Sequence, residues 1–371
     1  MDTINANITS ASHQHPLTIA IDCRMLEASG AGVYLRGCLP FFLESGNKLL
    51  LLGNAGRLEH LKSNANVSVI ECDIEPFSIK ELFFFPRKIA RQINGTDLYY
   101  SPFFNIPGGI KIPVYSTIHD IIFPDMPELT SRLGLTIRMF LYNRCFKRSK
   151  KIFTVSQFSK SRIEYYSKGK KPVIVTYSAI QPQFLNYRTA TRGKIQKKET
   201  IVFIGNIKKH KGLDCLFEAF ALARKEGLPY SLIIIGKREI FRSADKVVLQ
   251  KIESASHEAI SFVGFVSDEQ LMEHLAEASL LVQPSLYEGF CLPPLEALVL
   301  GTNVLVSDIP VLKEIYSGFP VRFFTAGDTH DLKSKIMEAL SGTKSLSLPE
   351  NLIDKYTFEK TASIILQSIS P

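Results

Sequence analysis

The sequence predicts an α/β fold with two domains, each built around a largely parallel sheet. Short apolar runs alternate with helix-like segments through most of the 371 residues, and a polar, basic stretch at 181–199 interrupts this alternation. A chain of this length is too long for one ordinary domain and suffices for two. The hydrophobic content of 45% allows a core in each domain, and the 22% of charged residues argues against a disordered chain.

The first half of the chain begins with LTIAIDC, an apolar run that is typical of a buried parallel strand. A glycine-containing turn at 28–32 and a helix-like stretch at 33–43 follow it. Residues 80–93 have a helical pattern that Pro86 should break. Strands are predicted at 17–23, 49–53, 67–72, 97–102, 114–120, 151–156 and 172–178.

The second half restarts the alternation after residues 181–199, which we interpret as an interdomain linker. We assign 1–180 to an N-terminal domain, 200–354 to a C-terminal domain, and 355–371 to a C-terminal helix that packs back on the N-terminal domain. Two doubly wound domains in tandem place a cleft between the carboxyl ends of their sheets. The strands of this half are predicted at 199–205, 231–236, 260–265, 279–285 and 303–308.

Charge and cysteine content narrow the class of protein. The net charge of +8 either serves an anionic partner, such as an acidic membrane surface or a phosphate-bearing substrate, or only aids solubility. No nucleic-acid-binding module is recognisable, so nucleic acid is not expected as the partner. The six cysteines are scattered singly, which argues against a disulfide framework or zinc site and favours a reducing cytoplasm. Residues 1–16 lack the apolar core of a secretory signal, and no apolar run reaches the roughly 18–20 residues of a membrane span.

The most informative segment is PSLYEGFCLPPLEA at 284–297. A strand ends at Pro284, a loop carries Glu288, and two prolines mark the first turn of a helix that contains Glu296. A helix start that faces a cleft offers free N–H groups and a positive dipole end, which suit a diphosphate. The two glutamates would then contact opposite ends of one extended ligand. The alternative is that Glu296 only caps its helix.

Glu288-x7-Glu296 resembles the E-x7-E signature of retaining GT-B glycosyltransferases, family 4 in particular, and the flanking P-S-x-x-E-G-F and L-P-x-L-E-A match as well. The resemblance covers nearly the whole second domain, which would bind a nucleotide sugar, while the first would bind the acceptor. It implies that Glu288 faces the donor sugar and that Glu296 binds ribose hydroxyls. It also implies that backbone amides around Phe290, Cys291 and Leu292 hold diphosphate oxygens, although the family usually has glycine where this chain has Cys291.

A second segment, VFIGNIKKHKGLD, places basic residues between Gly205 at a strand end and a following helix. An amine beside a helix start suits a diphosphate leaving group, and a solvated basic turn is the alternative. The segment resembles the G-x5-K element of the family, which implies that Lys211 binds the diphosphate. The family often has arginine at the positions of Asn206 and His210. Lys208 is the candidate substitute, and Gly205 and Asn206 are also donor-binding candidates.

A third segment, IAIDCRMLEASGAGVYL, carries Gly30 and Gly32 between a strand and a helix, where backbone can approach a phosphate. It is similar to the opening of mannosyltransferase-like members of the family, D-x-R followed by S-G-x-G-x-Y. The resemblance implies that the two glycines close over the donor and that the donor carries mannose or a related sugar. We interpret Asp22 and Arg24 as an internal ion pair that holds this loop.

A fourth segment, STIHDIIFPDMP, places His119 and Asp120 at a predicted strand end, where α/β enzymes place functional groups. A lone histidine is more often structural. In the family, an H-D pair at this point lies against the donor sugar, which implies that His119 contacts the sugar hydroxyls. Ser156 is interpreted as structural, as the cap of a helix that starts near Phe158.

The resemblance further implies a front-face displacement with retention of anomeric configuration, in which the leaving diphosphate helps to deprotonate the acceptor. Glu288, His119 and Lys211 are the catalytic candidates. No D-x-D motif lies near a phosphate site, so neither a metal nor another cofactor is expected. The nucleotide that the resemblance implies is guanosine diphosphate, with uridine diphosphate as the alternative.

The acceptor is less defined by the sequence. Residues 80–92 and 132–151 combine large apolar side chains with basic ones, which suits contact with the anionic inner face of a membrane. Core-facing apolar stripes with solvated charges are the alternative. A glycan or polyprenyl-linked acceptor of lipopolysaccharide, O-antigen or other surface polysaccharide synthesis fits the net charge. Competing functions are a GT-B phosphorylase or sugar-phosphate synthase, and a non-catalytic sugar-nucleotide-binding protein.

Overall fold

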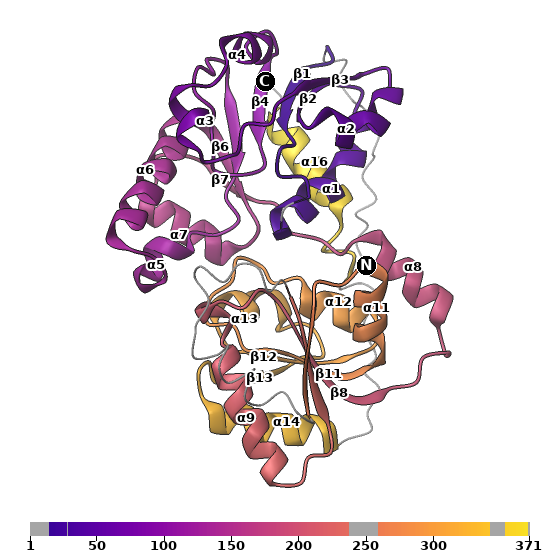
Figure 1. Ribbon diagram of the computed structural model, residues 1–371. Coiled ribbons are helices and arrows are strands. Elements are labelled where there is room, and N and C mark those ends of the chain that lie inside the picture. Colours follow the sequence, from indigo (N-terminus) through magenta and orange to yellow (C-terminus); the bar gives the residue numbers. More distant parts are fainter. Residues whose placement is uncertain (1–14, 28, 237–258, 342–352, 370–371) are drawn as a thin grey trace, which may run out of the picture. The chain divides into compact units, whose positions relative to one another are not determined.

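The computed structural model describes residues 15–27, 29–236, 259–341 and 353–369, and these form two parallel sheets (Figure 1). The seven-stranded sheet comprises β1 Thr18–Asp22, β2 Lys48–Gly53, β3 Val67–Glu71, β4 Leu98–Ser101, β5 Val114–Thr117, β6 Ser149–Thr154 and β7 Val173–Val175. The six-stranded sheet comprises β8 Lys198–Ile204, β9 Ser231–Ile235, β10 Ile260–Gly264, β11 Ala278–Gln283, β12 Asn303–Ser307 and β13 Arg322–Phe324. The predicted α/β fold with two Rossmann-like sheets is confirmed. Every predicted strand is present, and β13 was missed.

The order of strands places a switch point in each sheet. The orders are β3-β2-β1-β4-β5-β6-β7 and β10-β9-β8-β11-β12-β13, so the chain progresses outward in both directions from an inner pair, β1/β4 or β8/β11. Ligands of doubly wound folds bind at the carboxyl ends of such a pair. In the second sheet, residues 205–212 follow β8 and residues 284–292 follow β11. Two of the predicted site segments therefore begin at one switch point.

Local sequence signals determine several helix boundaries. Pro86 lies at the N-cap of α4 and divides the helical pattern at 80–93 into α3 and α4, as predicted. The Ser156 hydroxyl accepts a hydrogen bond from the Ser159 amide at 3.0 Å, which confirms it as the cap of α7. The helices are α1 Ser29–Leu43, α2 Ala55–Leu58, α3 Ile79–Phe83, α4 Arg87–Ile93, α5 Ile122–Asp125, α6 Arg132–Arg148, α7 Gln157–Ser167, α8 Pro182–Thr191, α9 Leu213–Lys225, α11 Asp268–Glu277, α12 Pro293–Val299, α13 Pro310–Tyr316, α14 Thr329–Ser341 and α16 Phe358–Ile369, with short 3-10 turns at Glu59–Ser63, Pro127–Leu129 and Lys209–Lys211.

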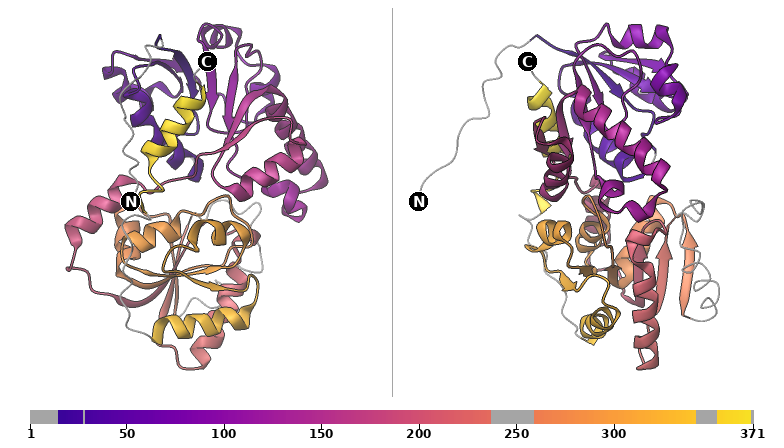
Figure 2. Two further views of the ribbon diagram at one scale, coloured as in Figure 1. Left: turned by 180° about the vertical axis from the view of Figure 1, so that it is seen from behind. Right: turned by 90° about the vertical axis from the view of Figure 1, so that its left-hand side faces the viewer.

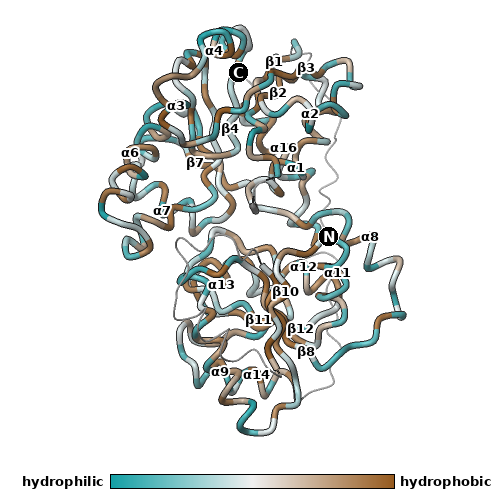
Figure 3. Tube along the Cα trace, in the orientation of Figure 1, coloured by the Kyte–Doolittle hydropathy of each residue, from teal (hydrophilic) through white to brown (hydrophobic). Residues whose placement is uncertain are grey.

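Helices pack on both faces of the six-stranded sheet, while its edge strand β10 is only partly buried (Figure 2). Apolar side chains of β8, β9 and β11 share one core with α9 and α14, and Phe203, Phe220 and Leu280 in that core are almost fully buried. The strands are accordingly the most hydrophobic part of this region (Figure 3). This core fixes the strand ends from which the site segments extend.

Contacts divide the chain into two compact units, Met1–Ser116 and Thr117–Pro371.

The predicted linker at 181–199 contains helix α8, which the sequence did not indicate because the segment lacks an apolar stripe. Pro182 occupies the first turn of α8, a position that proline favours.

The C-terminal helix α16 packs on strands of the seven-stranded sheet. The Thr361 hydroxyl donates to the Thr176 carbonyl at 3.0 Å, and the Lys151 ammonium donates to the Ser368 carbonyl at 2.7 Å. Ahead of the helix, the Ile180 amide donates to the Tyr356 carbonyl at 3.1 Å. These bonds join the chain's last segment to residues 151–180.

Candidate active site

The segments after β8 and β11 pack directly against each other. The Leu286 amide donates to the His210 carbonyl at 2.7 Å. Gly212, at the start of α9, has a φ of 66°, and a Cβ at this position would collide with the Pro284 carbonyl oxygen. Glycine is therefore required here for both its backbone conformation and its small size. The close packing brings Lys211 and Glu288 together.

Lys211 and Glu288 form a largely buried ion pair. The Lys211 ammonium lies 2.6 Å from Glu288 Oε1, and the two side chains are 19% and 10% exposed. The Ser285 hydroxyl donates to the same oxygen at 2.7 Å, a contact that the sequence did not predict. Burial disfavours both charges, but mutual attraction outweighs it: the pKa of Lys211 is raised and the pKa of Glu288 is lowered. Both groups are therefore charged at neutral pH.

Two further basic side chains lie beside this pair. Burial, and next the charge of Lys211, lowers the pKa of Lys208. Lys208 has no hydrogen-bond or ion-pair partner among the described residues. Burial and Lys211 also lower the pKa of His210 to about 4, so that this imidazole is neutral at pH 7. The half-buried Lys208 ammonium thus remains available for an anion.

The backbone after Glu288 carries unused donors. Within the described part of the chain, the amides of Phe290, Cys291 and Leu292 donate to no acceptor. Cys291 has a φ of 72°, the left-handed conformation that favours glycine, and the Tyr316 hydroxyl binds its carbonyl oxygen. Burial raises the pKa of the Cys291 thiol well above its usual value, so the thiol is unreactive. Three adjacent amides in this geometry can bind anionic oxygens.

The backbone conformation of Cys291 predicts an unusual order of stability. Cys291→Gly should be about 1 kcal/mol more stable than Cys291→Ala, because both lose the thiol but only alanine retains the Cβ that is strained at positive φ. Chemical denaturation of the two variants measures the difference. At a position with an ordinary backbone conformation, the alanine variant is more stable than the glycine variant. If Cys291→Ala were the more stable of the two, residue 291 would not keep its left-handed conformation.

Glu296 is buried and has no hydrogen-bond or ion-pair partner in the described part of the chain. Its side chain lies in the first turn of α12 and is 6% exposed. No described residue donates a hydrogen bond to its carboxylate, so the alternative of a capping role has no support in the structure. Burial, and next the charge of Asp268, raises the pKa of Glu296 to about 8. At neutral pH this carboxyl group is therefore largely protonated, and it can both donate a hydrogen bond to a ligand and accept one.

The segment that carries His119 also reaches the Glu288 loop within residues 117–371. A Cβ on Gly289 would collide with the His119 carbonyl oxygen, which accepts a hydrogen bond from the Ser159 hydroxyl at 3.1 Å. Burial, with a contribution from Glu288, raises the pKa of Asp120. The structure therefore brings the candidate residues His119, Asp120, Lys211 and Glu288 into one region.

Gly30 and Gly32 belong to the other compact unit and lie inside α1, which begins at Ser29. The prediction that the helix starts at Val33 was wrong by one turn. A Cβ on Gly32 would collide with the carbonyl oxygens of Met25 and Leu26, whereas Gly30 has open space around it. The need for glycine at 32 is thus explained by local packing.

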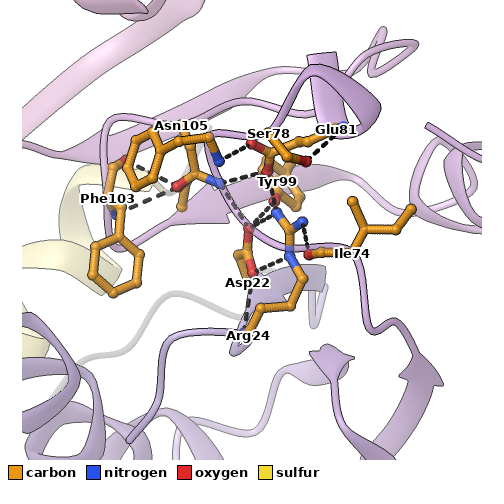
Figure 4. Close-up of polar contacts among 10 residues, drawn as sticks. Asp22, Arg24, Ile74, Ser78, Glu81, Tyr99, Phe103 and Asn105 are labelled. Atoms are coloured by element: carbon orange, nitrogen blue, oxygen red, sulfur yellow. Dashed lines mark hydrogen bonds and ion pairs between the residues drawn. The ribbon is translucent and has the colours of Figure 1, made fainter. Parts of the chain in front are cut away.

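Arg24 is the centre of a buried polar network in the same unit (Figure 4). Its guanidinium lies 2.5 Å from both Asp22 Oδ2 and Glu81 Oε1, and all three side chains are at most 2% exposed. The Tyr99 hydroxyl donates to Asp22 at 2.7 Å, and the Asn105 amide donates to Glu81 at 2.7 Å. The predicted Asp22–Arg24 ion pair is confirmed. Through the contact of Arg24 with Glu81, the network joins the end of β1 to α3.

Among the described residues, no helix is long and apolar enough to cross a bilayer, and no group of three or more potential metal-ligating side chains is found. The six cysteines are all free and buried.

Comparisons with known proteins show what this chain is similar to. Residues 189–355 match the family described as Glycosyl transferases group 1. O-antigen chain mannosyltransferase B of Escherichia coli is 29% identical over 227 residues, which cover 59% of this chain and 58% of that protein. O-antigen chain mannosyltransferase RfbU of Salmonella typhimurium is 26% identical over 255 residues, which cover 67% of each chain.

Solved structures share the fold over almost the whole chain. Anabaena HepE in complex with UDP and glucose has a TM-score of 0.70 at 17% identity, and the match covers 95% of this chain and 99% of that one. A sucrose-phosphate synthase from Thermosynechococcus elongatus has a TM-score of 0.73 at 14% identity, over 95% and 98% of the two chains. These likenesses establish the two-domain GT-B fold.

Proposed function

We propose, from the match of residues 189–355 to the family described as Glycosyl transferases group 1, that this chain transfers a hexose from a nucleotide-diphosphate donor to a glycan or lipid-linked glycan. The observation that carries this proposal is the buried Lys211–Glu288 pair beside three unused amides and the unpartnered Glu296. The Lys211 ammonium matches the charge of a diphosphate, and the three amides match its oxygens. The Glu296 carboxyl group matches the hydroxyls of a ribose.

The diphosphate is assigned to Lys211, Lys208 and the amides of Phe290, Cys291 and Leu292. Positive charge and oriented N–H groups in a water-poor site stabilise a leaving group without reorganisation during the reaction. The two amines supply the charge that a divalent cation supplies in other transferases. We therefore propose a metal-independent reaction without a cofactor, with Gly205 and Asn206 bordering the same oxygens.

The sugar is assigned to Glu288 and His119, and the ribose to Glu296. Glu288 is ionised and can stabilise positive charge that develops on the sugar ring, while His119 orients the hydroxyls. This arrangement suits a front-face displacement with retention, in which a diphosphate oxygen helps to remove the acceptor proton. Gly30 and Gly32 are proposed to contact the donor from the first domain.

Mannose is the favoured sugar and guanosine diphosphate the favoured nucleotide, with uridine diphosphate as the alternative. The mannosyltransferases of O-antigen chains support mannose. The HepE structures contain UDP, UDP-glucose or UDP with glucose, which keeps a uridine donor under consideration. The resemblance in fold to sucrose-phosphate synthase leaves a sugar-phosphate synthase as the second candidate.

Product analysis tests the proposal. The full chain is incubated in EDTA with GDP-mannose and a polyprenyl-diphosphate-linked O-antigen glycan, and the product is examined by mass spectrometry and by NMR of the new anomeric centre. We expect one added hexose with retained configuration. Transfer to a soluble sugar phosphate in place of the glycan would support the synthase, and donor binding without any transfer would support a non-catalytic protein.

A membrane contact is proposed for α6, where the lipid-linked acceptor would be presented. Leu133, Ile137 and Phe140 are 71%, 51% and 51% exposed and follow each other on one face of the helix. The sequence of α6 contains arginine and lysine but no acidic residue. In the other unit, Phe83 and Phe84 are exposed at 66% and 71% beside basic residues of α4, whereas Phe85 is buried. Exposed apolar side chains within a basic surface fit an anionic membrane surface.

Vesicle sedimentation tests this contact. The protein should bind vesicles of phosphatidylcholine mixed with phosphatidylglycerol and not vesicles of phosphatidylcholine alone. The double variant Ile137→Ser, Phe140→Ser should bind these vesicles about tenfold more weakly, since the Ile137 and Phe140 side chains would each bury apolar area in the membrane interface. Tyr165→Ser, which removes a 68%-exposed side chain from α7, is the control. Unchanged sedimentation of the α6 variant would exclude this surface.

A further inference from the structure

Asp125, at the end of α5, accepts hydrogen bonds from three side chains that lie far from it in sequence, two on α7 and one directly before Glu288. Arg162 binds the carboxylate with a forked contact, Nε to Oδ2 at 2.8 Å and Nη2 to Oδ1 at 2.5 Å. The Tyr166 hydroxyl donates to Oδ1 at 2.8 Å, and the Tyr287 hydroxyl donates to Oδ2 at 2.9 Å. The Asp125 side chain is 8% exposed. Although burial disfavours its charge, these donors hold the pKa of Asp125 below its usual value.

Tyr287 differs from the other donors because it directly precedes Glu288. Its hydroxyl donates to Asp125, so it is bonded to the segment that follows His119. Its ring packs edge-on against Phe158, with ring centroids 5.4 Å apart, and the residue is 7% exposed. The backbone from which Glu288 extends is therefore fixed to residues 121–125.

Gly289 makes the corresponding contact on the other side of Glu288. Its Cα faces the His119 carbonyl oxygen so closely that a Cβ would collide with it. Glu288 is thus flanked by two residues that both contact the 119–125 segment. Lys211 and Ser285 bind its carboxylate but do not contact that segment through any described bond. The relative position of Glu288 and His119 therefore depends on Tyr287 and Gly289.

We propose that Tyr287 and Asp125 are positioning residues that align Glu288 with His119 across the donor sugar. The consequence for catalysis rests on the proposed function, whereas the alignment itself does not. Neither residue is assigned a contact with the donor. Arg162 and Tyr166 keep the Asp125 carboxylate in place, so that its second oxygen faces Tyr287 in one fixed direction. A displacement of about 1 Å in a reacting group is sufficient to reduce a rate by about 100-fold.

Tyr287→Phe tests the kinetic consequence, because it removes the hydroxyl and keeps the ring that packs on Phe158. We expect kcat for sugar transfer to fall by about 10–100-fold, with KM for the donor within about threefold of the native value. Tyr166→Phe is the matched control, since it removes a tyrosine hydrogen bond from the same carboxylate but does not contact the Glu288 loop. It should leave kcat within about twofold. Equal losses in the two variants would overturn the proposal.

Amide hydrogen exchange of the same proteins measures the alignment without any substrate. Tyr287→Phe should increase deuterium uptake in both 119–125 and 286–290, and Tyr166→Phe should leave 286–290 unchanged. If uptake in 119–125 is the same in Tyr287→Phe and the native protein, the alignment is refuted. If the native protein transfers no sugar from any nucleotide donor, the proposed function fails, and the exchange comparison still decides whether Tyr287 couples the two segments.

Discussion

Lys211→Met is expected to lower kcat/KM for sugar transfer by about 10²–10³-fold, because it removes the charge that we propose stabilises the leaving diphosphate. The ammonium lies 2.6 Å from Glu288 Oε1 in a pair that is mostly shielded from water. Lys209→Met is the matched control, since Lys209 belongs to the same short turn but is exposed. Steady-state kinetics of the two variants measure the effect. Similar losses in both would show that the basic turn acts only through its general charge.

The same variant has a second, separable effect on stability. Loss of Lys211 leaves the Glu288 carboxylate buried without its cation, which costs about 3–5 kcal/mol. Adding Glu288→Gln removes the uncompensated charge, so the double variant should recover most of the free energy of unfolding while transfer remains lost. Chemical denaturation with parallel kinetics separates the two effects. If activity returned together with stability, the role of the pair would be structural.

Glu296→Gln is expected to stabilise the folded protein at high pH while weakening nucleotide binding. The pKa of Glu296 is raised from 4.5 to about 8 in the folded state, so the carboxyl group binds its proton more tightly there than in the unfolded chain. The stability that this tighter proton binding gives to the folded state is fully present below pH 4.5, and it is lost as the pH rises through about 8. A tenfold change in proton affinity corresponds to about 1.4 kcal/mol, so the total loss of stability is several kcal/mol.

Thermal melts from pH 5 to pH 9 measure this pH dependence. The Tm of Glu296→Gln should be close to that of the native protein at the acidic end and exceed it increasingly toward the alkaline end. Glu269→Gln removes an exposed carboxylate from α11 and serves as the control. At pH 9, where the Glu296 carboxyl group is ionised, affinity for the nucleotide should fall by about 10–100-fold, because the proposed hydrogen bonds from ribose hydroxyls to this carboxylate are lost. If Glu296→Gln were less stable than the native protein at pH 9 and bound the nucleotide equally well, the assignment of Glu296 to the ribose would be contradicted.

Strand positions, and the edge of the second sheet from which the candidate site extends, were predictable from the sequence, because buried parallel strands leave continuous apolar runs. ETIVFIG and SLLVQPS became β8 and β11, and Gly205 and Pro284 after them mark the switch point. β13 has three residues and begins with Arg322, so it leaves no apolar run, whereas the equally short β7 is Val-Ile-Val. Helix α8 lacked an apolar stripe, and its existence depends on tertiary packing that no local pattern records.

Side-chain partnerships were predictable only where residues are close in sequence or belong to a recognised motif. Asp22 and Arg24 are two positions apart, and their ion pair was predicted. Tyr287 and Asp125 are separated by 162 positions, and neither belongs to the motif patterns, so nothing in the sequence connected them. The left-handed backbone of Cys291 was indicated indirectly, since the resembling family usually has glycine at this position.

Isothermal titration calorimetry of guanosine diphosphate in the presence of EDTA tests the central claim most directly. We predict that the native protein binds one nucleotide per chain without a divalent cation, that Lys209→Met binds equally well, and that Lys211→Met binds at least tenfold more weakly. Binding that requires a divalent cation, or native affinity in Lys211→Met, would contradict the assignment of the diphosphate to Lys211 and the amides after Glu288.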